Sequence, residues 1–216
     1  MKLVWDKVGE KKFETGVDHG ILFPMTNGTY ENGVAWSGLT AVNEAPSGAE
    51  PTKIYADNNV YGVVMSPEED ALTIEAFTYP PEFSPCIGEK ELSPGVVIKQ
   101  QEHQHFGFAY RTLIGNDEAG TKAGYKLHLF YDCLAGSSED SNSTVNDSPE
   151  QKTYSYSVTT VPVPVADNSP TACITIDSTL VDSTILTAIE DLLYGTVSAE
   201  STLPTPARIM QIISGQ

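Results

Sequence analysis

Period-two alternation decides the fold, and it is clearest in Gln104-His105-Phe106-Gly107-Phe108-Ala109-Tyr110-Arg111-Thr112. In an extended chain Phe106, Phe108 and Tyr110 point to one side, and the residues between them point to the other. The stretch Tyr125-Lys126-Leu127-His128-Leu129-Phe130-Tyr131-Asp132-Cys133 repeats the scheme. The two stretches predict β-strands, each with one strongly apolar face.

Shorter alternating or apolar runs predict further strands on both sides of this pair. They lie at residues 17–24, 33–42, 53–56, 60–65, 71–79, 96–101, 153–161 and 172–176. Turn residues such as Asn27-Gly28 and Gly115-Asn116-Asp117 separate them, and Pro80-Pro81 ends the run at 71–79 because proline donates no ladder hydrogen bond. Many short strands at this spacing are typical of a β-sandwich or a partly closed barrel.

One segment has a helical period instead. Between residues 182 and 194 the apolar positions form a single stripe, preceded by Asp182 as a natural N-cap and followed by Gly195 as a natural stop. The sequence therefore predicts one flanking helix at about 183–194, which we expect to pack on the chain's own sheet. Residues 207–213 are predicted to add a short turn, giving a C-terminal helical segment at about 183–213.

The length of 216 residues fits a single domain, 1–216, with several appendages. Residues 1–12 are either an ordinary first strand or an N-terminal arm. Polar stretches at about 43–52 and 136–151 are predicted as long inter-strand loops. The second is rich in Ser and Asn and contains four acidic residues but no Lys or Arg.

Charge excludes several classes of protein. Lys and Arg number 12 against 29 Asp and Glu, so the formal net charge is −17. A protein that grips nucleic acid by its phosphates, or an anionic membrane surface, needs clustered basic residues. The sequence has no apolar run long enough to span a bilayer and no apolar signal-like stretch after Met1, so we expect a soluble protein made in the cytosol.

The residues that carry chemistry form no recognisable catalytic motif. His103 and His105 share one face of an extended chain, as a two-histidine metal site requires, with His128 or Glu75 as a third ligand, but exposed strand histidines are the favoured interpretation. There is no GxSxG, HExxH, Walker or GxGxxG motif. We therefore predict no catalytic residue, no metal site and no cofactor.

The three cysteines are far apart and form no CxxC pair. An odd number without an export signal predicts free thiols rather than a disulfide framework. Cys133 and Cys173 lie in apolar alternating stretches, where a thiol serves as a small core residue.

Several stretches, taken in order, carry a family resemblance. They are Tyr55-Ala56-Asp57-Asn58, the run from Ala71 to Phe83, Phe106-Gly107-Phe108-Ala109-Tyr110-Arg111-Thr112-Leu113-Ile114-Gly115-Asn116-Asp117, Gly124-Tyr125-Lys126-Leu127-His128-Leu129 and Asn146-Asp147-Ser148-Pro149. Together they resemble the major tail (tail tube) proteins of siphophages and prophages of Gram-positive bacteria. The resemblance covers roughly residues 53 to 195, and no single motif is diagnostic.

The resemblance implies a structural role in the virion. Members of that family form six-fold rings that stack into a hollow β-lined tube, assembled in the host cytoplasm, through which phage DNA passes without specific binding. Their partners are copies of themselves, a tape-measure protein, a tail terminator and distal tail or baseplate proteins; no membrane is involved. An acidic wall suits such a conduit, since it repels a duplex that carries a charge about every 1.7 Å.

The resemblance also suggests where contacts are made. Glu75 is the candidate lumen-facing residue, although Phe77 and Tyr79 share its predicted face and fit a channel badly. Candidate inter-ring or intersubunit contacts are Trp5, Glu44, Glu50, Glu139, Asp140 and Asp147.

Two other functions stay open at this point. The alternative is a non-viral, ligand-binding β-sandwich for carbohydrate or adhesion, since two Trp and 10 Tyr leave room for exposed aromatic residues. A hydrolase with an unrecognised site is the least favoured.

Overall fold

The computed structural model describes residues 3–142, 144 and 151–215, and β-strand is its main secondary structure. The strands are β1 (Phe13–Thr26), β2 (Thr29–Tyr30), β3 (Val34–Trp36), β4 (Leu39–Glu44), β5 (Ser47–Gly48), β6 (Pro51–Ala56), β7 (Asn59–Met65), β8 (Glu68–Glu69), β9 (Ala71–Ala76), β10 (Lys90–Ser93), β11 (Val96–Ile98), β12 (Phe106–Asn116), β13 (Gly120–Ala135), β14 (Tyr154–Thr160) and β15 (Cys173–Asp177). The helices are the 3-10 helix η1 (Pro81–Ile87) and the α-helices α1 (Ser183–Tyr194) and α2 (Pro206–Ser214). None of the described helices is long and apolar enough to cross a membrane.

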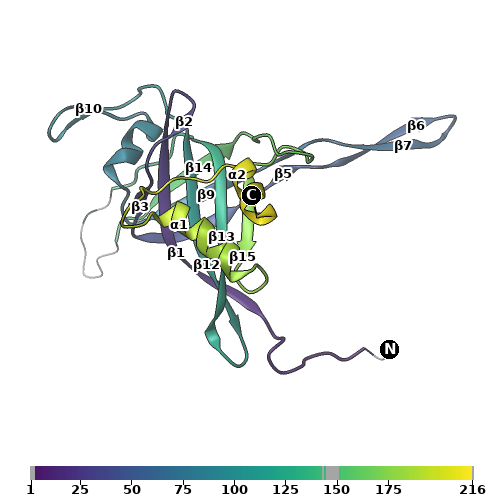
Figure 1. Cartoon of the computed structure of the whole chain (residues 1–216). Helices are drawn as coiled ribbons and strands as arrows, with labels where there is room; N and C mark the ends of the chain where they lie inside the picture. The colour runs from purple at the N-terminus through teal and green to yellow at the C-terminus, as the bar shows by residue number, and fades with distance from the viewer. Residues whose placement is uncertain (1–2, 143, 145–150, 216) are drawn as a thin grey trace.

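Nine strands form one antiparallel sheet (Figure 1). Its order is β2-β1-β12-β13-β14-β9-β4, with β3 beside β1 and β15 beside β13. The sheet is curled but not closed into a barrel, so the predicted mainly β, sandwich-like class is confirmed. The two stretches quoted first in the sequence lie in β12 and β13, at the centre of this sheet, where Tyr110 stands opposite His128.

One core cluster, here called the inner core, lies on one face of the curled sheet. It consists of Leu22, Trp36, Leu72, Ile74, Ala76, Phe83, Cys86, Phe106, Phe108, Tyr110, Phe130, Cys133, Ala135, Tyr156 and Val158. Phe83 of η1 packs 4.5 Å from the Trp36 ring, measured between ring centroids. The helix η1 thus contributes a buried aromatic side chain to a core that is otherwise built mainly from the strands.

The helix-side core lies on the opposite face of the same sheet. It consists of Ile21, Phe23, Ala109, Leu127, Leu129, Tyr131, Ile176, Ile189, Leu193, Leu203 and Ile209. The first helix, α1, begins as predicted, since Asp182 accepts a hydrogen bond of 2.8 Å from the Thr184 amide, and it ends before Gly195, whose φ is 73°. Burial of Ile189 and Leu193 confirms that α1 packs on its own sheet.

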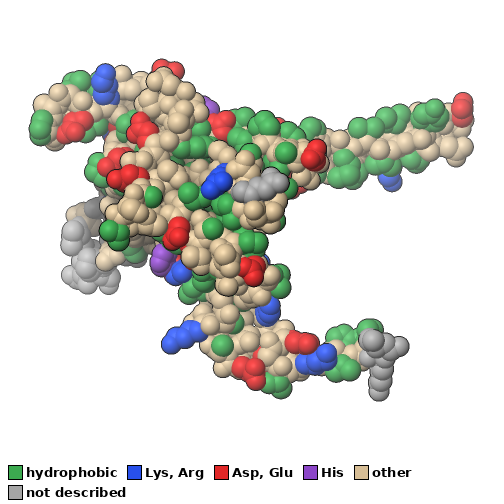
Figure 2. All heavy atoms as spheres, in the orientation of Figure 1, with side chains coloured by type: hydrophobic (Ala, Val, Ile, Leu, Met, Phe, Trp, Pro, Cys, Tyr) green, Lys and Arg blue, Asp and Glu red, His purple; other side chains and the backbone are tan. Residues whose placement is uncertain are grey.

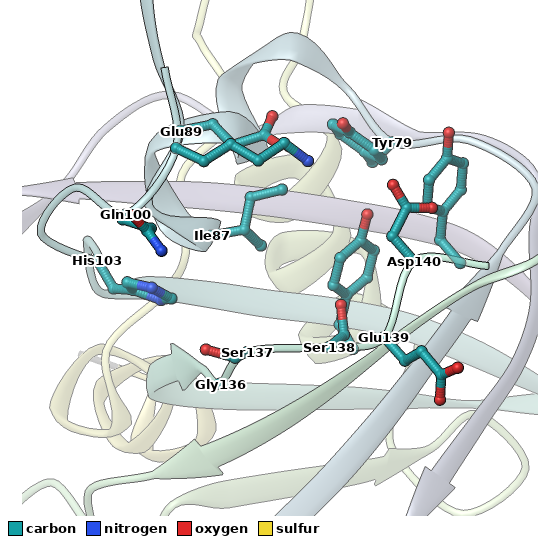
Figure 3. Close-up of a pocket in the computed structure, with 13 residues that line it drawn as sticks. Tyr79, Ile87, Glu89, Gln100, His103, Gly136, Ser137, Ser138, Glu139 and Asp140 are labelled. Atoms are coloured by element: carbon teal, nitrogen blue, oxygen red, sulfur yellow. The ribbon is translucent and has the colours of Figure 1, made fainter. Parts of the chain in front are cut away.

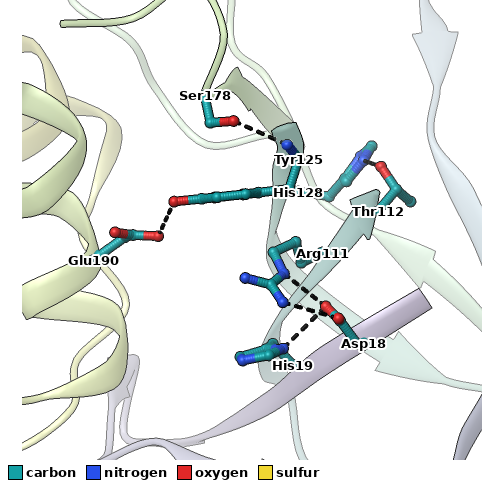
Figure 4. A network of polar contacts seen from close by, with 8 residues as sticks. All are labelled: Asp18, His19, Arg111, Thr112, Tyr125, His128, Ser178 and Glu190. Carbon is teal, nitrogen blue, oxygen red and sulfur yellow. Dashed lines mark hydrogen bonds and ion pairs between the residues drawn. The ribbon is translucent and has the colours of Figure 1, made fainter. Parts of the chain in front are cut away.

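A polar network fastens α1 to the sheet beside this core (Figure 4). Arg111 donates two hydrogen bonds to Asp18, at 2.7 and 2.9 Å, and its guanidinium lies 4.8 Å from the centroid of the Tyr125 ring. Tyr125 in turn donates a hydrogen bond of 2.6 Å to Glu190 of α1. Arg111 lowers the pKa of Asp18, while burial first and Glu190 second raise the pKa of Tyr125 to about 12.

Several predicted elements differ from the observed ones. The strand at 33–42 is two strands, β3 and β4, because Gly38 turns the chain with a φ of 84°. The strand at 96–101 is confined to β11, and the predicted terminal turn is the nine-residue helix α2, which Thr205 caps. The helix η1 had no sequence signal, because Pro80-Pro81 indicates only that a strand ends.

The predicted loop at 43–52 is the largest difference. Most of it belongs to β4, β5 and the start of β6. It therefore runs from the edge strand of the large sheet, through the β5–β8 pair, into the β6–β7 hairpin. Its prolines and Gly48 mislead a sequence pattern, because both residue types are rare in central strands but acceptable where one strand edge is free. In the other predicted loop, residues 136–142, 144 and 151 contain no helix or strand.

Three appendages leave the body of the molecule (Figure 1). The β6–β7 hairpin extends far to one side, residues 3–12 leave in another direction without helix or strand, and the β10–β11 hairpin lies at the opposite end from both. These appendages contribute no residue to either core, so their sequence is free to serve something other than the fold of one chain.

Candidate functional site

The strands β14, β9 and β4 leave one face of the sheet outside the helix-side core. The side chains on this face, here called the open face, are Ala41, Asn43, Ala71, Thr73, Glu75, Ser155, Ser157 and Thr159. Their neighbours along each strand, such as Ile74 and Val158, belong to the inner core, which places the eight on the other side. The open face is small, polar and without Lys or Arg, and Glu75 is its one carboxylate.

The structure places Glu75, partly buried, on the open face, where it stands opposite Ser155 and Ala41. Tyr79 does not share that face, whereas Phe77, the first residue after β9, is 47% exposed. Tyr79 instead packs against the inner core, where its ring lies 6.0 Å from Phe83. The predicted strand at 71–79 was three residues too long, and that extra length placed Tyr79 on the wrong face.

An unpaired edge borders the open face. β4 is the last strand in the sheet order and pairs with β9 alone among the described strands. Backbone donors and acceptors on such an edge are available to a strand of another chain.

From β4 the chain continues into the β6–β7 hairpin, whose side chains are mostly apolar and exposed. The exposed fractions lie between 47% and 79% for Ile54, Tyr55, Val60, Tyr61, Val63, Val64 and Met65. Figure 2 shows these hydrophobic side chains along the length of the hairpin. Both faces carry apolar side chains, because the adjacent residues Val63 and Val64 point to opposite faces. Val63 is paired with Lys53 and Val64 with Thr52.

The hairpin has a defined turn but little else to hold it. Asp57 and Asn58 have φ values of 50° and 62°, the two positive values that a type I′ turn needs. A lone two-stranded hairpin is only marginally stable in water, and this one carries only Lys53 and Asp57 as charges within β6, its turn and β7. Neutral, apolar and extended, it has the character of a contact surface.

Glu44, a predicted intersubunit contact, is the last residue of β4, where the chain leaves the sheet toward the β6–β7 hairpin. It has partners within its own chain. Tyr110 donates a hydrogen bond of 2.5 Å to Glu44 Oε1. His128 Nδ1 lies 3.0 Å from the same oxygen, in a direction unfavourable for a hydrogen bond, and His128 Nε2 lies 3.0 Å from Thr112 Oγ1. His128 lowers the pKa of Glu44, and burial raises the pKa of Tyr110.

The N-terminal segment containing Trp5 is exposed and attached at one point. Leu3, Val4, Trp5 and Val8 are between 64% and 76% exposed. At Gly9 the backbone amide donates to Asp117, and Asn116 donates to the Gly9 carbonyl. Residues 3–8 thus form a short free arm.

The remaining predicted contacts lie elsewhere. Glu50 is exposed beside the start of β6, and its amide donates to Ser66. Glu139 and Asp140 line a cavity of about 200 Å³ together with Tyr79, Tyr154 and Tyr156 (Figure 3). Lys152 pairs with Asp140 there and lies over the Tyr154 ring. Asp147 lies outside the described residues.

The two histidines of the metal hypothesis do not converge. They precede β12 rather than lying in it, so the predicted common strand face does not exist. His103 Nδ1 lies 2.8 Å from the Ala135 carbonyl oxygen, whereas His105 Nδ1 lies 2.6 Å from Asp132. Within residues 3–142, 144 and 151–215, no group of three or more His, Cys, Asp or Glu is arranged to hold a metal ion.

Cys86 and Cys133 are buried free thiols, and Cys173 is a partly buried one. Burial raises the pKa of the Cys86 and Cys173 thiols to about 12 and that of Cys133 well above its usual value. Since the thiolate is the reactive form of cysteine, burial lowers the reactivity of all three side chains.

Comparison with known proteins adds no family. No protein-family model matches the chain, and no curated protein matches it. The open face, the edge of β4 and the exposed hairpin are therefore the features on which function must be argued. Sequence reasoning missed the hairpin as a unit; the signal was the pair of apolar runs around Asp57-Asn58, which predicted its strands but not their isolation from the body.

Proposed function

We propose that this chain is the structural subunit of a phage tail tube, in which six-fold rings of copies stack into a hollow channel that conducts DNA. The observation that carries the proposal is the open face, a polar sheet surface without Lys or Arg beside the edge of β4, which the described residues leave uncovered and unpaired. The family resemblance of residues 53–195 points to the same role.

The chemistry of the open face suits a channel wall for DNA. Basic side chains would release counterions from a duplex and hold it, which slows passage. Ser, Thr, Asn and Ala present no such charge, and Glu75 repels phosphate over roughly 10 Å at 0.1 M salt. Their small size also leaves a smooth surface. In this proposal the open faces of β14, β9 and β4 from successive copies line the lumen.

The unpaired edge and the hairpin supply the reason for assembly. A ring joins the edge of β4 to a neighbouring copy, which removes the exposed backbone groups. The exposed side chains of the β6–β7 hairpin lose contact with water only when another copy covers them, at about 25 cal/mol for each Å² of apolar area buried. Both effects favour a polymer over a monomer.

The partners follow from the resemblance and are proposed on that basis. They are copies of this chain, a tape-measure protein inside the tube, a tail terminator and distal tail or baseplate proteins. The proposed location is the virion tail, after assembly in the host cytoplasm.

Negative-stain microscopy of the purified protein tests the proposal. Striated hollow tubes or six-fold rings are expected. A variant that carries both Val63→Asp and Val64→Asp places charge on the two faces of the hairpin and is expected to lose tubes while keeping its circular dichroism spectrum. The matched control is Leu180→Asp, at a side chain that is 80% exposed outside the hairpin, and it should assemble normally. A strictly monomeric wild type under every assembly condition contradicts the proposal.

The wall is tested by charge reversal in assembled tubes. Ser155→Lys together with Ser157→Lys puts two ammonium groups on the open face, and tubes of this variant should retain short duplex DNA in a salt-dependent way. Wild-type tubes should release it, and a double variant elsewhere, Thr187→Lys with Asp191→Lys on α1, should behave like wild type. Equal DNA retention by the open-face and α1 variants would place the lumen elsewhere.

A carbohydrate-binding or adhesion module is the second candidate, favoured by the cavity in Figure 3. Its three tyrosines and its carboxylates Glu89 and Asp140 are groups that stack on and hydrogen-bond to sugars. Binding on a glycan array that is lost in Tyr154→Ala, by a protein that stays monomeric, would support this candidate over the tube.

A further inference from the structure

His128, in the middle of β13, is a buried titratable side chain with one ring nitrogen left without a hydrogen bond. The residue is only 8% exposed. Its Nε2 lies 3.0 Å from Thr112 Oγ1 (Figure 4), whereas its Nδ1 has no hydrogen-bond partner among the described residues. A buried polar atom without a partner costs free energy, so this nitrogen points to a second state of the network in which it is bonded.

The groups that contact the ring favour its protonated form. Nδ1 lies 3.0 Å from Glu44 Oε1, and the Tyr110 ring stacks on the imidazole with 4.6 Å between ring centroids and 6° between ring planes. A cation is attracted both by a neighbouring carboxylate and by an aromatic face. A protonated imidazole has an N–H at both nitrogens, so Nδ1 can then donate to Glu44 while Nε2 donates to Thr112.

The neighbouring strands bring no unpaired positive charge to oppose that proton. On β15, Thr175 pairs with His128, and burial raises the pKa of the Cys173 thiol to about 12, so the thiol is neutral. Along β13 itself, Lys126 shares the face of His128 and forms an ion pair with Glu14 of β1.

Two carboxyl groups near the ring differ in how they respond to acid. His128 holds the pKa of Glu44 below its ordinary value of 4.5, so this carboxylate stays ionised over the range from pH 8 to pH 5 in which histidines change charge. Asp70, which precedes β9, is the other carboxyl close enough to act on Glu44. Burial first, and then Glu68 and Glu44, raise the pKa of Asp70.

Glu44 lies where a change in its bonding affects the course of the chain. It is the last residue of β4, and the amide of the next residue, Ala45, donates a hydrogen bond of 2.7 Å to the Ala71 carbonyl. Beyond this bond the chain leaves the large sheet for β5 and the β6–β7 hairpin. Whatever fixes the Glu44 side chain therefore also fixes the end of the strand.

We infer that His128 is a proton-sensitive switch that controls how firmly the end of β4 is held to the sheet. Uptake of a proton from solvent gives an imidazolium whose Nδ1–H bonds Glu44, and this bond holds the point from which the chain continues to the β6–β7 hairpin. Loss of the proton leaves Nδ1 unbonded and loosens the strand end. The switch belongs to a single chain, so the inference goes beyond the proposed function and stands or falls apart from it.

Native-state hydrogen exchange, followed by NMR on the dilute, unassembled full-length chain at pH 5 and pH 8, tests the switch. Exchange rates are expressed as protection factors, which removes the intrinsic effect of pH on exchange. The Ala45 amide should be about tenfold better protected at pH 5, the scale of one hydrogen bond to a charged group. The Phe77 amide donates to the Gly38 carbonyl at the other end of the β4–β9 pair and should show no such difference.

Three variants assign the effect to its groups. His128→Gln keeps a polar side chain that cannot take up a proton, and it should abolish the difference at Ala45. Glu44→Gln leaves the histidine in place and removes its acceptor, so it gives the same readout should His128→Gln fail to fold. His105→Gln is the matched control at a more exposed histidine, which pairs with Asp132, and should keep the full difference.

The outcomes decide between His128 and its rival Asp70. A difference that is present in the wild type and His105→Gln but absent from His128→Gln and Glu44→Gln supports the switch. Equal protection of Ala45 at the two pH values in the wild type overturns it. A difference that survives in His128→Gln and is lost in Asp70→Asn assigns the effect to Asp70 and overturns it as well.

Discussion

The two halves of one sheet face carry the same alternation and very different side chains. Over β12 and β13 that face bears Ala109, Leu127 and Leu129, which α1 and α2 cover. Over β14 and β9 it bears Ser155, Ser157 and Thr73, which no helix of the helix-side core covers. The inner core lies behind both halves, so the strands are held equally well from that side.

The difference shows how this chain separates stability from contact. Burial under the helices stabilises the fold, because each fully buried Leu or Ile contributes about 1.5–3 kcal/mol. The open face and the β6–β7 hairpin contribute little to either core, and their sequence is free to meet solvent, DNA or another copy. Substitutions that sample the two regions should therefore differ in their effect on the free energy of unfolding.

The largest effect is expected in the covered half. Leu129→Ala removes a fully buried side chain beneath the helices and should lower the free energy of unfolding by about 2–5 kcal/mol, measured by urea denaturation. Ser157→Ala on the open face is the matched control and should change it by less than about 0.5 kcal/mol. Similar losses from the two changes would mean that the open face is packed against something.

The next effect is electrostatic and depends on pH. Asp18→Asn removes the carboxylate that Arg111 holds with two hydrogen bonds and should cost about 1–2 kcal/mol at neutral pH. The pKa of Asp18 is lowered in the folded chain, so its stabilisation is present above the ordinary value of 3.8 and disappears as pH falls through the lower folded pKa. Denaturation midpoints between pH 7 and 2.5 should show the variant and the wild type converging at acid pH. Asp191→Asn, on the exposed side of α1, should instead follow the wild type throughout.

A smaller effect is expected at Glu44, where β4 ends and the chain leads to the β6–β7 hairpin. Glu44→Gln keeps the size of the side chain but removes the charge that accepts from Tyr110 and faces His128, and about 1 kcal/mol of stability should be lost. Urea denaturation at pH 7 measures this, with Glu50→Gln as the control at an exposed site beside the start of β6. An unchanged midpoint for Glu44→Gln would show that the network does not hold the β6–β7 hairpin to the body.

The smallest effect on the isolated chain is expected on the hairpin. Val64→Thr keeps the shape of an exposed side chain and should shift the free energy of unfolding of the monomer by less than about 0.5 kcal/mol. The same change should lower the melting temperature of assembled tubes more than that of the monomer, because only the polymer covers this residue. Equal shifts in both states would remove the hairpin from the interface.

Much of the fold could be read from residue patterns. Alternation around Phe106 and Leu127 located β12 and β13, Asn27-Gly28 located the β1–β2 turn, and Asp182 with Gly195 bounded α1. These signals are local, since each depends on residues within one strand, turn or helix. The errors at 43–52, at 71–79 and at the histidines before β12 arose where prolines or a non-local partner changed the end of a strand.

The candidate site was less accessible to sequence reasoning. Glu75 could be placed on a strand face from alternation alone, whereas the partners of Glu44 come from β12 and β13, more than 60 residues away along the chain. No pattern within one segment indicates such pairings.

The amino-acid sequence by itself determined where the chain is extended, where it turns and where its one long amphipathic helix begins and ends, because backbone sterics and period-two or helical burial act between near neighbours. Only the tertiary structure decided which half of the sheet the helices cover and which strand is left at the edge. Coverage depends on segments that meet across long stretches of chain, and alternation reports that two faces differ without reporting what lies against each.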